Sequence, residues 1–143
     1  MKIEVCNHNE IDALIDIWYQ GSIQSHHFIS KHYWYSQKYE MRNKYIPMSE
    51  TYVIYHQSKV VGFVSMVDNY LAALFIDTPY QRNGYGKELI NFIKRKKSNI
   101  SLKVYTKNKS AVAFYKKNDF IIKETLLDEN TNQEEYLMEW NKT

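Results

Sequence analysis

The distribution of apolar and polar residues along the chain predicts short strands and amphipathic helices in a definite order. Apolar residues alternate with polar ones near the N-terminus, as in a half-buried strand. They then recur at helical spacing from Ile11 to Trp18, and Gly21 is the expected end of this helix. A second helix is expected after Ser30, and Pro47 closes that segment.

The rest of the chain continues with strands that two more helices interrupt. The expected strands cover 51–55, 60–67, 70–76, 100–105, 119–126 and 135–140, and the expected helices cover 84–97 and 108–118. The first three of these strands have short connections, which predicts an antiparallel meander. Strands and helices do not alternate strictly, so we expect an α+β fold: a mixed, mainly antiparallel sheet of about six or seven strands with helices on both faces.

Length and composition are those of one globular domain. The 143 residues include 44% hydrophobic and 24% charged residues, and we expect residues 1–143 to form a single domain. The net charge is +3, and the basic run Lys94–Lys97 at a helix end has no second basic stripe beside it, so no nucleic-acid partner is expected. The single cysteine, Cys6, and the lack of an apolar run of about 20 residues favour a cytoplasmic protein without a membrane span. No Cys/His cluster has the spacing of a metal site.

The stretch from Ala72 to Gly86 combines the features of an anion-binding site. A β-prone segment leads through a turn into Gln81-Arg82-Asn83-Gly84-Tyr85-Gly86, and a helical pattern begins directly afterwards. A helix N-terminus leaves backbone N–H groups unpaired, and glycines let a phosphate approach those groups closely. An ordinary strand-to-helix connection is the alternative. The pattern matches neither the P-loop nor the dinucleotide fingerprint.

Two spaced motifs make the chain resemble the GCN5-related N-acetyltransferases. Gln81-x-x-Gly84-x-Gly86 is similar to the Gln/Arg-x-x-Gly-x-Gly/Ala signature of that family. The segment from Val104 to Phe120 is similar to the family's later strand–helix segment. The resemblance covers roughly residues 1–140, and the one departure in the loop is that Thr78 precedes the proline at position 79.

This resemblance implies the acyl-CoA N-acyltransferase fold and an enzyme that uses acetyl-CoA, without a metal. The acetyl group would pass to an amine of a small molecule or protein by direct attack in a ternary complex. Tyr115 would share its proton with the departing thiolate, because a phenol has a pKa of about 10, close to that of a thiol. The residues implied to bind the coenzyme are Leu74, Phe75, Ile76, Gln81, Arg82, Asn83, Gly84, Tyr85, Gly86, Lys87, Asn108, Ala111 and Tyr115.

The general base and the acceptor stay open at this point. Asp68, at a turn between two strands, and His27, in the pair His26-His27, are the candidate bases, with Glu50, Asp77 and Glu124 as further possibilities. The protein is expected to be a monomer or a homodimer, in which the final strand, 135–140, can take part. The alternative function is that of a sensor or interaction module that binds acetyl-CoA without catalysis.

Overall fold

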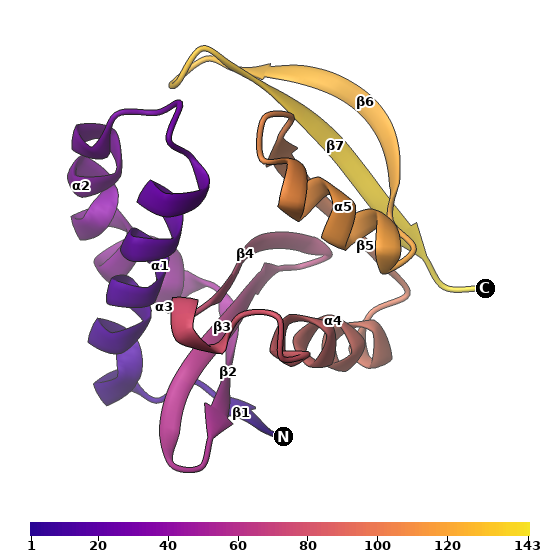
Figure 1. The fold of residues 1–143 in the computed structure, drawn as a ribbon. Coiled ribbons are helices and arrows are strands. Elements are labelled where there is room, and N and C mark those ends of the chain that lie inside the picture. The colour runs from indigo at the N-terminus through magenta and orange to yellow at the C-terminus, as the bar shows by residue number, and fades with distance from the viewer.

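The computed structural model describes all 143 residues and places seven strands in one open sheet (Figure 1). The strands are β1 (Lys2–Val5), β2 (Glu50–His56), β3 (Lys59–Val67), β4 (Tyr70–Ile76), β5 (Asn99–Tyr105), β6 (Ile121–Asp128) and β7 (Gln133–Asn141). Their spatial order is β1-β2-β3-β4-β5-β7-β6, and β4 and β5 form the one parallel pair. The mixed, mainly antiparallel α+β fold expected from the sequence is confirmed.

Helices cover both faces of this sheet (Figure 1). On one face lie α1 (Ile11–Ser25), α2 (Lys31–Glu40) and the short α3 (Ile46–Met48), with the π-helical segment η2 (Met41–Tyr45) between α2 and α3. On the other face lie α4 (Tyr85–Lys96) and α5 (Lys109–Lys117). Two 3-10 turns, η1 (His8–Glu10) and η3 (Thr78–Tyr80), precede α1 and α4. The longest helix has 15 residues, and none has an apolar stretch of membrane-spanning length.

The sheet separates two hydrophobic clusters because alternate residues of a strand point to opposite faces. In β2, for example, Ile54 belongs to the cluster of 17 buried residues under α4 and α5, whereas Val53 belongs to the cluster of 12 under α1 and α2. The apolar residues identified in the sequence fill these clusters. Leu89 and Ile93 of α4 belong to the larger cluster, and Leu14 of α1 belongs to the smaller one.

The helix α1 is longer than the sequence predicts. The expectation that Gly21 ends it is wrong, since the helix continues to Ser25. A Cβ at position 21 would lie 2.8 Å from Cδ1 of Phe75 on β4. Glycine therefore stands here because the helix packs closely on the sheet, and not because the helix stops.

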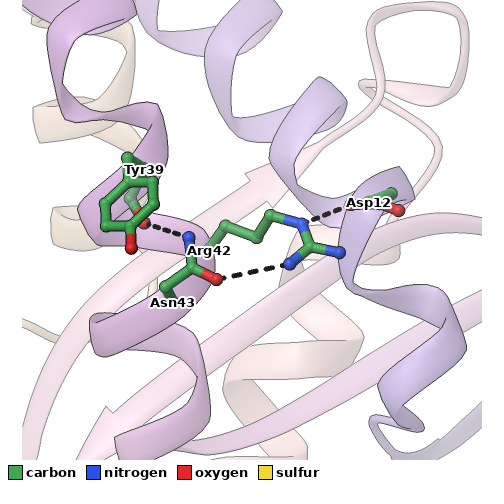
Figure 2. Close-up of polar contacts among 4 residues, drawn as sticks. All are labelled: Asp12, Tyr39, Arg42 and Asn43. Carbon is green, nitrogen blue, oxygen red and sulfur yellow. Dashed lines mark hydrogen bonds and ion pairs between the residues drawn. The ribbon is translucent and has the colours of Figure 1, made fainter.

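A polar link ties α1 to the π-helical segment (Figure 2). Arg42 Nε lies 2.6 Å from Asp12 Oδ1, and the Arg42 guanidinium also donates to Asn43 Oδ1 at 3.3 Å. Asn43 Nδ2 in turn donates to the Tyr39 carbonyl oxygen at 2.9 Å. The Arg42 guanidinium lowers the pKa of the Asp12 carboxyl. Because both charged groups are exposed to solvent, this pair fixes the register of two helical segments more than it stabilises the fold.

The final strand, β7, lies inside the sheet, paired on both sides by β5 and β6. The edge of the sheet next to β7 is β6, which exposes Ile121 and Leu127, and β1 forms the opposite edge. A contact between two copies through 135–140 would have to use side chains, because the backbone of β7 is already paired.

The sheet opens between its two central strands. β4 and β5 share one pair of register partners, Tyr70 and Ser101, and the Ser101 N–H donates to the Asn69 carbonyl oxygen at 2.9 Å. Beyond this contact the two strands diverge, and Figure 1 shows the two halves of the sheet turning away from each other. The opening faces the helices α4 and α5 on one side.

A bulge in β4 accompanies this divergence. The register with β3 moves from the pair Ser65–Ala73 to the pair Met66–Leu71, which leaves Ala72 without a partner. An extra residue bends its strand and increases the local twist. The bend turns the C-terminal part of β4 away from β5.

The close packing of β3 on β4 gives a stability test at Gly62, the register partner of Ile76. A Cβ at position 62 would lie 2.9 Å from the Phe75 carbonyl oxygen, a backbone atom that cannot move freely. We expect Gly62→Ala to lower the free energy of unfolding by about 1–3 kcal/mol, the usual cost of overpacking. Urea unfolding measures this loss. The exposed turn variant Ser58→Ala is the control, and an unchanged Gly62→Ala protein would show that the two strands are less tightly packed.

Candidate active site

The free edge of β4 faces the opening between β4 and β5. Asp77 N–H donates to the Val61 carbonyl oxygen of β3 at 2.7 Å. Because hydrogen bonding alternates along an antiparallel strand, the N–H groups of Leu74 and Ile76 point the other way, into the opening. An extended ligand rich in amides can pair with these groups as an added strand does.

The loop after β4 is shaped by its own side chains. Gln81 Nε2 donates to the Ile76 carbonyl oxygen at 3.0 Å, which closes the loop onto the end of the strand. Asn83 Nδ2 donates to the carbonyl oxygens of Tyr80 and Gln81 at 3.2 and 3.0 Å. These two amide side chains are therefore used to hold the loop in shape.

The helix α4 starts at the end of this loop with unpaired amides. Its first turn is closed by the bond from the Glu88 N–H to the Gly84 carbonyl oxygen, and no side chain caps it. The N–H groups of Tyr85, Gly86 and Lys87 therefore have no partner within the helix. Gly84 has a φ of 88°, in the left-handed region that favours glycine. Such a helix start attracts an anion such as a phosphate.

The helix α5 forms the opposite wall of the opening. Phe114 packs against the start of α4, since a Cβ at Gly86 would lie 3.2 Å from Phe114 Cζ. Tyr115 is 8% exposed, and its ring lies 5.6 Å from that of Phe120. Burial, with a smaller effect of Tyr70, raises the pKa of the Tyr115 phenol well above its ordinary value. The phenol therefore keeps its proton at neutral pH and can act as a donor.

Asn108 connects this wall with the other face of the sheet. Its Oδ1 accepts from the Ala111 N–H at 3.3 Å and so caps α5. Its Nδ2 lies 3.2 Å from Nε2 of His26, which belongs to the turn after α1. The His26 side chain is 8% exposed, and burial lowers its pKa to about 4. The imidazole is thus neutral at neutral pH.

A group of half-buried tyrosines and carboxylates lies at the other end of the opening. Tyr105 donates its O–H to Asp128 Oδ2 at 2.6 Å, and Glu135 on β7 is the register partner of Tyr105. Burial, and then the charge of Asp128, raises the pKa of the Glu135 carboxyl. Burial, followed by the charges of Glu135 and Asp128, also raises the pKa of Tyr70.

This arrangement suits an extended, amide-rich ligand that carries an anionic group at the start of α4. A model of the acetyltransferase (GNAT) domain matches residues 47–122, more than half of the chain. The chain belongs to the GNAT acetyltransferase family. The enzyme class and the family expected from the two sequence motifs are therefore confirmed.

Relatives of this acetyltransferase match over most of their length. The peptidyl-lysine N-acetyltransferase YiaC of Escherichia coli is 28% identical over 139 residues, which are 96% of this chain and 95% of that protein. The peptidyl-lysine N-acetyltransferase YjaB of Salmonella typhimurium is 30% identical over 121 residues, 84% of this chain and 83% of that protein.

Solved structures match the GNAT domain over its full extent. The apo form of YjaB from Escherichia coli has a TM-score of 0.86 at 23% identity and covers 99% of this chain and 98% of its own. The PaiA N-acetyltransferase of Thermoplasma acidophilum, solved in complex with coenzyme A, has a TM-score of 0.79 at 22% identity, with 99% of each chain covered. Because both sequence identities are below 25%, the structural similarity supports the fold alone.

The segment matched by the family model contains the glycine loop, α4 and α5 of this acetyltransferase. His26 and Glu135 lie outside it. Both sequence motifs therefore lie inside the matched segment, and the binding roles expected of their residues stay a prediction.

The two candidate bases from the sequence lie on the surface of the domain. Asp68 is exposed at the tip between β3 and β4 with a φ of 53°, and it makes no hydrogen bond or ion pair. His27 is exposed in the turn after α1, with its ring 5.6 Å from that of Phe28. Neither side chain contacts Tyr115, and their role as bases stays a prediction.

Sequence reasoning named His26 only as a member of the histidine pair, with His27 as the candidate base, and it did not consider Glu135. Extending the helical spacing of α1 past Gly21 to Ser22 would have placed His26, four residues further, on the buried side. Glu135 carries no local signal, because its position depends on the pairing of β7 with β5. No group of three or more His, Cys, Asp or Glu side chains is placed to hold a metal ion.

The start of α4 gives a test of the loop conformation at Gly84. A Cβ there would meet only Met1 Cε, at 3.8 Å, so a substitution is opposed by the left-handed backbone and not by a clash. We expect Gly84→Ala to lower the free energy of unfolding by about 1 kcal/mol and Gly84→Asn to lower it less, because asparagine tolerates this conformation better. Urea unfolding compares the two variants. Equal stability of Gly84→Ala and wild type would contradict the left-handed geometry.

Proposed function

We propose that this enzyme transfers the acetyl group of acetyl-CoA to the amine of a lysine side chain in a ternary complex. The observation that carries the proposal is the opening between β4 and β5, which leaves backbone amides of β4 unpaired. In this proposal the Tyr115 phenol, buried in the cluster under α4 and α5, serves the facing wall. The names of YiaC and YjaB as peptidyl-lysine N-acetyltransferases support the acceptor. The coenzyme A complex of a structural neighbour supports the donor. Residues 1–143 act as a single domain in this proposal.

The pyrophosphate of the coenzyme binds at the start of α4 in this proposal. The free N–H groups of Tyr85, Gly86 and Lys87 face it, and Gly84 and Gly86 keep that approach free of side chains. Arg82 and Lys87 add exposed positive charge at the rim. Gln81 and Asn83 contribute by holding the loop, as their hydrogen bonds indicate.

The pantetheine arm lies along β4. The backbone amides of Leu74 and Ile76 pair with the amides of the arm. Phe75 separates these two residues along the strand, and its ring packs on the other face of the sheet. Asn108 and Ala111, at the start of α5, border the arm from the opposite wall.

The chemical step forms a C–N bond and breaks the C–S bond of the thioester. The amine nitrogen attacks the carbonyl carbon, and the Ile76 N–H stabilises the negative charge that develops on the carbonyl oxygen. When the tetrahedral intermediate collapses, the sulfur leaves as a thiolate, and the Tyr115 phenol stabilises it by donating a hydrogen bond. The thiolate then takes its proton from solvent, and the phenol keeps its own. The proton of the attacking amine goes to a base and then to solvent.

We place Glu135 ahead of Asp68 and His27 as that base. Glu135 is half-buried beside Asp128, which brings its pKa closer to neutrality than that of an ordinary carboxyl, as general base catalysis requires. The two carboxylates also favour a cationic acceptor, whose ammonium group they attract before it loses its proton. The tyrosine rings nearby, Tyr70 and Tyr105, suit the aliphatic stem of a lysine side chain.

The role of Tyr115 is tested with Tyr115→Phe, which removes the hydroxyl and keeps the ring. We expect kcat with a lysine peptide to fall about 100-fold, the usual contribution of a positioned proton donor, while the Kd for coenzyme A changes less than about threefold. Release of free thiol from acetyl-CoA measures turnover, and calorimetry measures the Kd.

Tyr39→Phe, at a tyrosine that is 75% exposed, is the matched control and should behave as wild type. Normal turnover by Tyr115→Phe would remove the proposed role of this phenol. Absence of any heat when coenzyme A is titrated into the wild-type protein would overturn the proposed function as a whole.

The role of Glu135 is tested through the pH dependence of kcat/KM. A base must be deprotonated to act, so activity in the wild type is lost as the pH falls through the raised pKa of Glu135. The loss of activity at low pH forms the acidic limb of the pH profile. We expect Glu135→Gln to lower kcat/KM about 100-fold and to abolish this acidic limb. The neighbouring exposed variant Glu134→Gln should keep both the rate and the limb. An acidic limb that persists in Glu135→Gln would assign the base to another group.

A further inference from the structure

We propose that His26 is a positioning residue whose imidazole fixes the Asn108 amide, so that the turn after α1 holds the coenzyme-side helix α5 in its binding orientation. The inference rests on the proposed function, because Asn108 is there a neighbour of the pantetheine arm. It concerns a residue outside the segment that the family model matches.

The bond joins two segments that are 82 residues apart in the chain. Asn108 Nδ2 and His26 Nε2 lie 3.2 Å apart, across the opening of the sheet. The imidazole cannot swing away, because aromatic rings enclose it. It stacks on Trp34 at 5.1 Å between ring centroids and meets Tyr105 and Phe28 edge-on at 5.1 and 5.7 Å.

The polarity of this bond is fixed by the other bonds of Asn108. Its Oδ1 accepts from the Ala111 N–H at 3.3 Å and from the Ser110 hydroxyl at 3.4 Å, so the NH2 group faces the imidazole. An NH2 group can only donate, and Nε2 of His26 must therefore be the acceptor. The neutral imidazole then carries its proton on Nδ1, a buried atom that has no hydrogen-bond partner. The bond to Asn108 is consequently the one side-chain hydrogen bond of the ring, and the Ser22 backbone carbonyl acts on the imidazole as well.

Protonation of His26 would break this arrangement. An Nε2–H would point at the Asn108 NH2 group, and the amide could rotate only by giving up the cap of α5. The Ser22 backbone carbonyl favours the charged form of the imidazole, but no carboxylate bonds to the ring. The Tyr105 phenol, whose ring meets His26 edge-on, donates to Asp128, and Lys107 lies over the ring of Phe28. Burial accordingly lowers the pKa of His26.

The bond leaves Asn108 with one free N–H for the coenzyme. An Asn amide has two N–H groups, and His26 takes only one of them. With the amide plane held by the cap on one side and the imidazole on the other, the second N–H has a fixed direction. Coenzyme binding then does not have to order this side chain, which improves affinity.

Two substitutions of His26 separate this hydrogen bond from simple packing. Glutamine places its Oε1 where Nε2 stands and can accept from Asn108, whereas asparagine is too short to reach it. We expect His26→Gln to keep the Kd for coenzyme A within about twofold and His26→Asn to raise it about fivefold, the effect of one neutral hydrogen bond. His32→Gln, at an exposed histidine on α2, is the control and should leave the Kd unchanged.

The tautomer is read directly in the wild-type protein without coenzyme. Long-range ¹H–¹⁵N correlation spectra should show His26 with its proton on Nδ1, and its signals should not move from about pH 8 to about pH 5.5, where an unperturbed histidine titrates. A proton on Nε2, titration near the ordinary pKa, or an equal loss of affinity in His26→Gln and His26→Asn would overturn the inference. Failure of the wild type to bind coenzyme A would instead refute the proposed function, and the spectra would still decide whether the bond exists.

Discussion

The divergence of β4 from β5 is the constraint on which the rest of this structure depends. Two neighbouring parallel strands normally satisfy each other's backbone groups along their whole length. Here one pair of residues, Tyr70 and Ser101, holds them together, and the bulge at Ala72 bends β4 away. The domain therefore keeps unpaired amides in its centre, and these are the groups that a ligand of pantetheine type requires. The helix start at Gly84 and the wall of α5 are useful because they border this opening.

The parts of the fold that depend on local sequence could be predicted. The alternation in β2 to β4, the apolar stripe of α4 and the cap at Ser30, whose hydroxyl accepts from the His32 N–H at 3.1 Å, all arise from residues close together in the chain. The glycine loop was found for the same reason. Its left-handed residue at Gly84 and its free N–H groups follow from a short motif.

The parts that depend on distant contacts could not be predicted. Gly21 has the composition of a helix end, but its actual role is set by Phe75, far along the chain. The bulge at Ala72 has no sequence mark, since alanine fits either register. The choice between His26 and His27 depends on how far α1 continues, and the place of Glu135 depends on the pairing of β7 with β5. The surroundings of His26 and Glu135 are assembled almost entirely from such contacts.

The open edge of β4 has a further consequence for the behaviour of the chain among other proteins. Unpaired strand edges recruit foreign strands and seed aggregates, and proteins protect them by covering or shortening them. In this domain the edge is recessed between a neighbouring strand and two helices, with Phe114 against Gly86 narrowing the way in. This position between neighbouring elements therefore protects the unpaired edge at the centre of the domain from pairing with a strand of another molecule.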